Sequence, residues 1–186
     1  MTTQQLMLST ELDIDKTVLV DNAVPVDDAA MRHCVGAFPS GVTVLTAKDE
    51  EKPVGMTISS FASVSLDPPL ILQCVSKTSS SLRHYSTGSS VVVNVLGCDQ
   101  ERVAKTFAKK GCDRFAEVET KEDSNGIPVL NGVAAWVSGK IDSIVDAGDH
   151  VILLIEAESV GRNDKAPLLY HSGQMYDWGR PIDAAL

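Results

Sequence analysis

The chain has 186 residues, of which 44% are hydrophobic and 22% are charged, and its net charge is −9. This size and composition indicate one folded domain and exclude a largely disordered chain. The acidic balance argues against a nucleic-acid binder, which needs a basic surface to contact phosphates.

The first part of the chain predicts an arm followed by a helix. Residues 1–26 show no clear period, and we expect an arm that is loosely attached or packs on a partner subunit, followed by one domain over residues 27–186. A helix begins near Asp27, which can cap it, and carries an apolar stripe of Ala30, Met31, Cys34, Val35 and Phe38.

The central part predicts strands and one further helix. VTVLTA (42–47) is β-branched, and a polar turn separates it from a hairpin partner at 53–59. Asp99 is expected to cap a helix that ends near Lys110, with Val103, Phe107 and Ala108 facing inward. A short helix, capped by Ser79 or Ser80, is expected after the loop that begins at 77. Further strands are predicted at 70–76, 90–96, 132–142, 150–161 and 167–171.

These six or seven strands and two or three short helices have hairpin-like connections and no regular βαβ alternation. That order favours a mainly β fold, a closed antiparallel barrel with a few peripheral helices.

Several site classes are not indicated. The four cysteines, Cys34, Cys74, Cys98 and Cys112, form no Cys-x-x-Cys pair, and we expect small buried thiols. The histidine spacings match no zinc or iron site. The longest apolar run, VILLI, is too short to span a membrane and no secretory signal is visible, so we expect a cytoplasmic protein.

Residues 55–70 read GMTISSFASVSLDPPL. In an extended chain, positions 57, 59, 63 and 65 place four hydroxyls on one face together with Phe61, while the even positions place mostly apolar side chains on the other. The apolar face can pack on a core, and a bend near 59–61 is expected. The hydroxyl face either lines a polar ligand or is a solvated sheet surface.

Two other polar stretches have the same two interpretations. SKTSSS (76–81) lies at a strand-to-helix junction and is either a phosphate cradle or an ordinary flexible loop. Gly148-Asp149-His150 opens a strand, and it either orients the imidazole toward a cavity, with Asp149 as its partner, or forms a solvated surface turn.

Taken together, these stretches resemble the short-chain NAD(P)H:flavin oxidoreductases, the reductase components of two-component flavin monooxygenases. The resemblance covers about residues 29–178 and implies a Greek-key split β-barrel that forms a homodimer, with flavin near the subunit interface. It rests on FPSGVTVLTA (38–47), GMTISSFASVSLDPPL (55–70), VNVL (93–96), DRF (113–115), AGDHVILL (147–154) and PLLYHSGQMY (167–176).

The resemblance also implies roles for individual residues, by motif position. The isoalloxazine and ribityl chain would contact Thr57, Ile58, Ser59, Ser60, Ser63 and Val64, with Asn94 near the flavin. The phosphate would be held by Ser76, Lys77, Ser79 and Ser80. The nicotinamide side would be bordered by His150, Phe115, Pro39, Ser40, Gly41 and Tyr176.

The implied activity is hydride transfer from NADH or NADPH to FMN or FAD, after which reduced flavin diffuses to a separate monooxygenase. Many members carry a basic residue where this chain has Ser172-Gly173-Gln174, which leaves the nicotinamide selectivity open. An alternative is a non-enzymatic flavin- or haem-binding split-barrel protein, and a third is a structural barrel that serves only as a partner subunit. The Gly-Asp-His turn and the DRF stretch favour the reductase.

Overall fold

A computed structural model describes residues 23–50 and 52–177. Most of the predicted arm, residues 1–22, lies outside the described residues. The chain divides into two compact units with the boundary between Val35 and Gly36, and each unit is described by itself. Within the described ranges, no helix is long and apolar enough to cross a bilayer.

The first unit contains most of α1 (Asp28–Gly36), which begins where the sequence predicts. Asp27 caps it, because the Ala30 backbone N–H donates to Asp27 Oδ1 at 2.8 Å. The helix has no buried residue, and Met31 and Val35 of its apolar stripe are each about half exposed.

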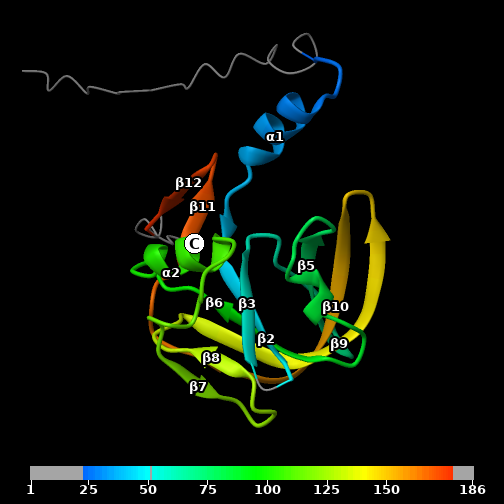
Figure 1. Cartoon of the computed structure of the whole chain (residues 1–186). Coiled ribbons are helices and arrows are strands. Elements are labelled where there is room, and N and C mark those ends of the chain that lie inside the picture. The colour runs from blue at the N-terminus through cyan, green and yellow to red at the C-terminus, as the bar shows by residue number, and fades with distance from the viewer. Residues whose placement is uncertain (1–22, 51, 178–186) are drawn as a thin grey trace, which may run out of the picture. The chain divides into compact units, whose positions relative to one another are not determined.

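The second unit is built mainly of antiparallel strands, which confirms the predicted mainly β class (Figure 1). Seven strands form one sheet in the order β3-β2-β6-β9-β10-β5-β4. Strand β11 pairs with β1 on one side and with β12 on the other, and β7 pairs with β8. The strands are β1 (Ser40–Gly41), β2 (Thr43–Asp49), β3 (Lys52–Ile58), β4 (Ala62–Leu66), β5 (Pro69–Ser76), β6 (Ser90–Val95), β7 (Thr120–Glu122), β8 (Pro128–Leu130), β9 (Ala135–Ala147), β10 (His150–Arg162), β11 (Leu169–His171) and β12 (Gln174–Tyr176). The helices are the 3-10 turn η1 (Leu82–His84) and α2 (Glu101–Ala108).

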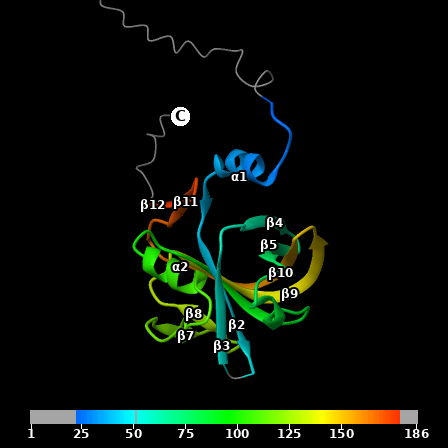
Figure 2. The same ribbon diagram turned by 45° about the horizontal axis from the view of Figure 1, so that its top comes forward.

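The long hairpin of β9 and β10 curves around the other strands of the sheet (Figures 1 and 2). Its register shifts twice, between Leu154 and Ile155 and between Ala157 and Ser159. Such bulges bend a strand and increase its twist, which lets a single sheet wrap around a core.

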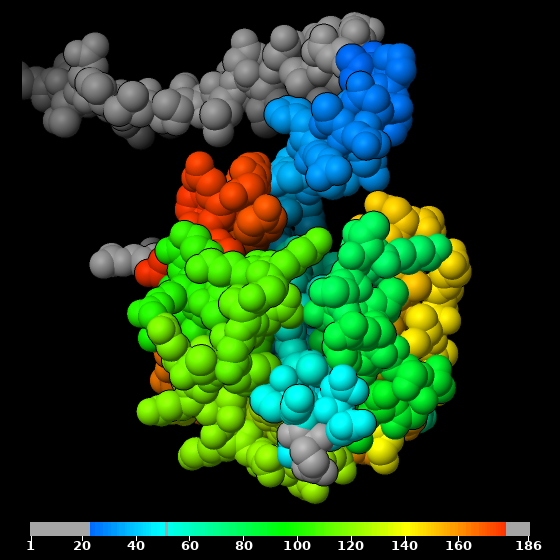
Figure 3. Space-filling view, in the orientation of Figure 1, coloured from blue at the N-terminus to red at the C-terminus, as the bar shows by residue number. Residues whose placement is uncertain are grey.

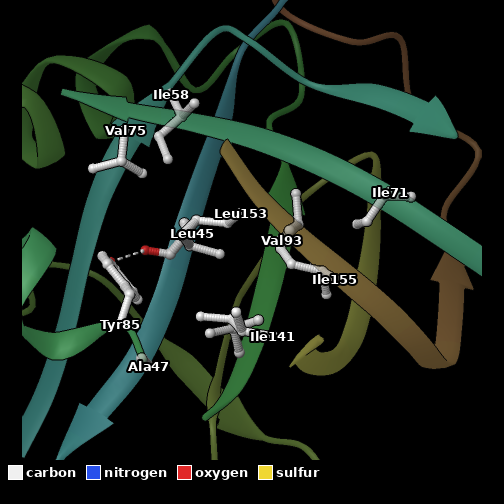
Figure 4. Packing of buried hydrophobic residues seen from close by; sticks show 11 residues of the cluster. Leu45, Ala47, Ile58, Ile71, Val75, Tyr85, Val93, Ile141, Leu153 and Ile155 are labelled. Atoms are coloured by element: carbon white, nitrogen blue, oxygen red, sulfur yellow. Dashed lines mark hydrogen bonds between the residues drawn. The ribbon is translucent and has the colours of Figure 1, made fainter. Parts of the chain in front are cut away.

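Strand β2 is buried on both faces, which explains its run of β-branched and apolar residues. Leu45 belongs to the cluster shown in Figure 4, together with Val93, Leu153 and Ile155. Val44 faces the opposite way, into a second cluster with Phe107 of α2 and with Leu96, Leu130 and Leu168. Alternate side chains of β2 therefore pack into two different cores, the cluster of Figure 4 on one face and a second core beneath α2 on the other.

Helix α2 differs from its prediction at both ends. Gln100, not Asp99, precedes its first turn, and Asp99 instead pairs with Lys165 at 2.8 Å. Ala104 rather than Ala108 is buried with Phe107. Ala104 and Phe107 belong to the second core, whereas Ala108 is the last residue of the helix and is exposed. In the short helix η1, which precedes α2 in the chain, neither Ser79 nor Ser80 is the N-cap: Ser81 occupies that position.

The segment 57–66 bends where the sequence predicts, since β3 ends at Ile58 and β4 begins at Ala62. The predicted apolar face does not pack on the core past this break. Ile58 is buried, but Val64 is 48% and Leu66 is 94% exposed. The break interrupts the alternation, and β4 is an edge strand of the sheet with few neighbours to cover it.

The prediction of buried thiols is wrong. Cys34 and Cys112 are exposed, Cys74 and Cys98 are partly exposed, and none of the four is in a disulfide. Cys112 lies in the loop after α2, where the apolar pattern of the helix has already ended.

Candidate functional site

The serine-rich loop after β5 lines a cavity of about 230 Å³. The loop folds tightly at the end of the strand, because Ser79 N–H donates to Ser76 O at 2.9 Å and Leu82 N–H donates to Ser79 O at 3.1 Å. We call this cavity the serine cavity, and it is lined by Met56, Thr57, Ser76, Thr78, Ser79, Ser80, Phe107, Ala108, Lys110 and Arg114.

Arg114 is fixed at the wall of the serine cavity by neutral acceptors. Its Nε and Nη2 donate to Lys109 O at 2.9 and 2.6 Å, and its Nη1 donates to Gly55 O at 2.5 Å and to Ser81 Oγ at 3.1 Å. In the part of the chain that the structure describes, no ion pair joins Arg114 or Lys110 to a carboxylate. Both positive charges therefore act on the cavity without a neutralising partner.

These two cations were missed by the sequence reasoning, which assigned the phosphate charge to Lys77. The Lys77 ammonium lies 2.7 Å from Asp146 Oδ2, and it does not line the serine cavity. The signal for Arg114 was present in the DRF stretch, of which only Phe115 was given a role.

His150 lies beside the serine loop. It opens β10, where it is the cross-strand partner of Ser76, and Lys77 N–H donates to Asp149 O at 2.9 Å. The Gly-Asp-His turn, with Gly148 at φ +64°, and the serine loop thus meet at one edge of the sheet. His150 Nδ1 lies 2.7 Å from Asp149 Oδ1, so Nδ1 donates to the carboxylate, and in a neutral ring Nε2 is left as an acceptor.

The hydroxyls of 57–63 divide into two groups. Thr57 Oγ1 donates to Ala104 O of α2 at 2.7 Å, and Ser60 Oγ accepts from Cys74 N–H at 2.8 Å and donates to Cys74 O at 3.1 Å. These two therefore hold the α2 and β5 segments in place. Ser59, Ser63 and Val64 are exposed, whereas the Ile58 side chain is in the core.

The Asn94 side chain is bonded within the protein. It is fully buried, where Nδ2 donates to Val44 O and Thr46 Oγ1, each at 3.1 Å, and Oδ1 accepts from Leu130 N–H at 2.8 Å. Strand β6 is an interior strand, flanked by β2 and β9, and the amide joins β8 to the sheet. The expected position of Asn94 near the flavin stays a prediction.

The residues expected on the nicotinamide side fall in three places. Ser40 and Gly41 of β1 and Tyr176 of β12 meet in the small sheet, where Leu169 is the cross-strand partner of both Gly41 and Tyr176. Pro39 precedes β1 and is exposed. Phe115 packs edge-on against Phe107, with ring centroids 4.9 Å apart, and His150 lies at the serine loop as described.

The donor set of the serine cavity fits a phosphate group. The hydroxyls of three serines and of Thr78 can donate hydrogen bonds, whereas the Thr57 hydroxyl already donates to Ala104 O. An ammonium and a guanidinium supply charge-assisted bonds. No carboxylate lines this cavity, so nothing there opposes an anion.

Comparison with known proteins gives the same picture. A family model described as a flavin reductase like domain matches residues 35–179. A probable flavin reductase of Rhizobium meliloti (strain 1021) is 44% identical over 129 residues, which cover 69% of this chain and 42% of that protein. The reductase component of a flavin-dependent trigonelline monooxygenase from Acinetobacter baylyi is 39% identical, over 78% of this chain and 47% of that protein.

Among solved structures, a NADH:FAD oxidoreductase of Streptomyces globisporus in complex with NAD and FAD fragments superposes with a TM-score of 0.80. It is 34% identical, and the match covers 87% of this chain and all of that one. The chain spans about half the length of the first curated relatives that it matches, between 42% and 56%.

Proposed function

The chain belongs to the flavin reductase-like domain family, and from this premise we propose that it is an NADH-dependent flavin reductase that supplies reduced FMN or FAD to a separate monooxygenase. The observation that carries the proposal is the serine cavity, in which hydroxyls from one loop face two cations that form no ion pair with a described carboxylate. NADH is favoured as the hydride donor because the Streptomyces globisporus protein, at 34% identity, is an NADH:FAD oxidoreductase.

The serine loop, Lys110 and Arg114 would hold the flavin phosphate. When bound, the flavin accepts a hydride from the reduced nicotinamide, and the protein's part is to bind, orient and shield the two rings. Orientation of this kind can contribute about 7–11 kcal/mol in the best cases, so no strong general acid is required. Exposed Ser59 and Ser63 are the hydroxyls of the 55–70 motif that remain available for the ribityl chain.

His150 would position the nicotinamide. Asp149 holds Nδ1, which leaves Nε2 to accept a hydrogen bond from a group such as the carboxamide N–H. We expect His150→Ala to lower turnover more than it lowers flavin affinity, while His33→Ala, on α1, serves as the matched control. An unchanged rate at saturating NADH would remove His150 from the mechanism.

A homodimer is the proposed assembly. Edge strand β4 and the segment before it leave Phe61, Val64 and Leu66 exposed at 37%, 48% and 94%. Exposed apolar side chains on a sheet edge are a place where another chain can pack. Light scattering should give twice the chain mass, and Leu66→Lys should shift the mass toward the monomer; a monomeric wild type would end this part of the proposal.

The first experiment measures NADH oxidation under air, first with FMN and then with FAD in excess. The loss of NADH absorbance gives the rate. Oxidation that saturates with added flavin supports the reductase. Flavin binding without oxidation would favour the carrier alternative, and no flavin binding at all would favour a structural barrel. The cytoplasmic location stays a prediction.

A further inference from the structure

A second cavity, of about 240 Å³, lies next to the serine cavity. The two share Ser80 and Arg114, so the guanidinium stands between them. Figure 3 shows this face hollowed between residues of the α2 segment, in green, and residues around 70–85, in blue-green. We call it the arginine cavity, and it is lined by Pro53, Val54, Gly55, Ser80, Ser81, Arg83, His84, Cys112, Asp113, Arg114 and Phe115.

The arginine cavity carries a second guanidinium that is held in place. Arg83 Nε donates to His84 Nε2 at 3.2 Å, and His84 Nδ1 lies 3.1 Å from Asp49 Oδ2. The His84 side chain is only 11% exposed, so this chain of contacts has a fixed base. Arg83 itself is exposed, and within the described residues it makes no ion pair.

The rest of the wall suits a nucleoside rather than a bare anion. Among the described residues that line the cavity, Asp113 is the one carboxylate, and an ionised carboxylate accepts hydrogen bonds from sugar hydroxyls. Pro53, Val54 and Phe115 provide an apolar side against which a flat base can pack. In the arginine cavity, the guanidinium charges thus match a phosphate, the Asp113 carboxylate matches a ribose, and the apolar wall matches a base.

We propose that the arginine cavity binds the adenosine diphosphate half of FAD, with its second phosphate between Arg114 and Arg83. This inference rests on the proposed function, because it places the flavin phosphate in the adjoining serine cavity. FMN ends at that phosphate and leaves the arginine cavity unused, whereas the diphosphate of FAD passes Arg114 into it. FAD is therefore the preferred flavin. The same adenosine diphosphate chemistry is present in NADH, so the test separates the two sources.

The test is a titration of the protein with FMN and, separately, with FAD. The quenching of flavin fluorescence reports binding and gives each Kd. Wild type should bind FAD more tightly than FMN. Arg83→Glu should weaken FAD binding about tenfold, as expected for loss of a charge-assisted contact at an exposed site, and should leave the Kd for FMN within about twofold. Arg102→Glu, on the exposed face of α2, is the matched charge-reversal control and should change neither Kd.

Three results would overturn the inference. If wild type binds FMN and FAD with equal Kd, and Arg83→Glu changes neither value, the arginine cavity holds no part of FAD. An effect of Arg83→Glu on the KM for NADH with no effect on the Kd for FAD would assign the cavity to the nicotinamide dinucleotide. Equal weakening of both flavins would mean that residue 83 acts through the serine loop.

Failure of the proposed function looks different. If wild type binds neither flavin, the reductase proposal and this inference fall together. If it binds and reduces both flavins equally well, only the inference falls.

Discussion

Replacing Asn94 by alanine tests whether this residue serves the core or the flavin. The substitution leaves Leu130 N–H, in a residue that is 1% exposed, without its acceptor at 2.8 Å. An orphaned buried donor costs about 1–3 kcal/mol. Val44 O and Thr46 Oγ1 also lose their donor, at a net cost of about 1 kcal/mol each. We therefore expect a loss of roughly 3–5 kcal/mol in the free energy of unfolding, a large part of the 5–15 kcal/mol that a domain of this kind has.

The assay is urea unfolding at one fixed protein concentration, with the slope of the transition compared between variant and wild type. Asn131→Ala is the matched control, because its Nδ2 donates to Glu119 Oε2 at 3.1 Å at an exposed site. That variant should stay within about 0.5 kcal/mol of wild type. An Asn94→Ala protein of unchanged stability whose flavin Kd rises tenfold would refute the reasoning, since the amide would then be acting on the ligand.

Two further changes probe how the site is held. A Cβ at position 55 would come 2.8 Å from Phe107 Cε1, so Gly55→Ala should lower the thermal midpoint of unfolding and weaken flavin binding as the end of α2 moves. Gly36→Ala is the control and should do neither, because its Cβ meets nothing closer than 3.8 Å. Equal midpoints for the two variants would contradict the packing argument. Burial raises the pKa of Tyr85 above its ordinary 10.0, against a smaller opposing effect of the Arg114 charge. The unfolded chain then loses this proton first, so stability falls as pH rises above about 10, and Tyr85→Phe should flatten that dependence in unfolding curves; an equally steep loss in the variant would assign the effect to another group.

The sequence by itself determined the strand pattern, the hairpin of β2 and β3, the bend at 59–61 and the family. These features depend on alternation, β-branched runs and turn residues, which are local and therefore readable along the chain. It also singled out the serine loop and the Gly-Asp-His turn as candidate ligand-binding stretches. Their meeting at one edge, through the pairing of Ser76 with His150, follows from an antiparallel register between strands far apart in sequence.

Only the tertiary structure decided which polar groups are available. Asn94 and Thr57 are polar positions along the chain, and the groups that they bond, in Leu130 and Ala104, come from segments that pack on them only in the fold. Lys77 is likewise paired with Asp146 of the β9–β10 hairpin. The Arg114 guanidinium lies at the serine cavity, where it is anchored to Gly55 and Lys109. A side chain's charge and hydrogen-bonding groups are fixed by its residue type, but whether a protein group or a ligand satisfies them depends on contacts that close long loops of chain.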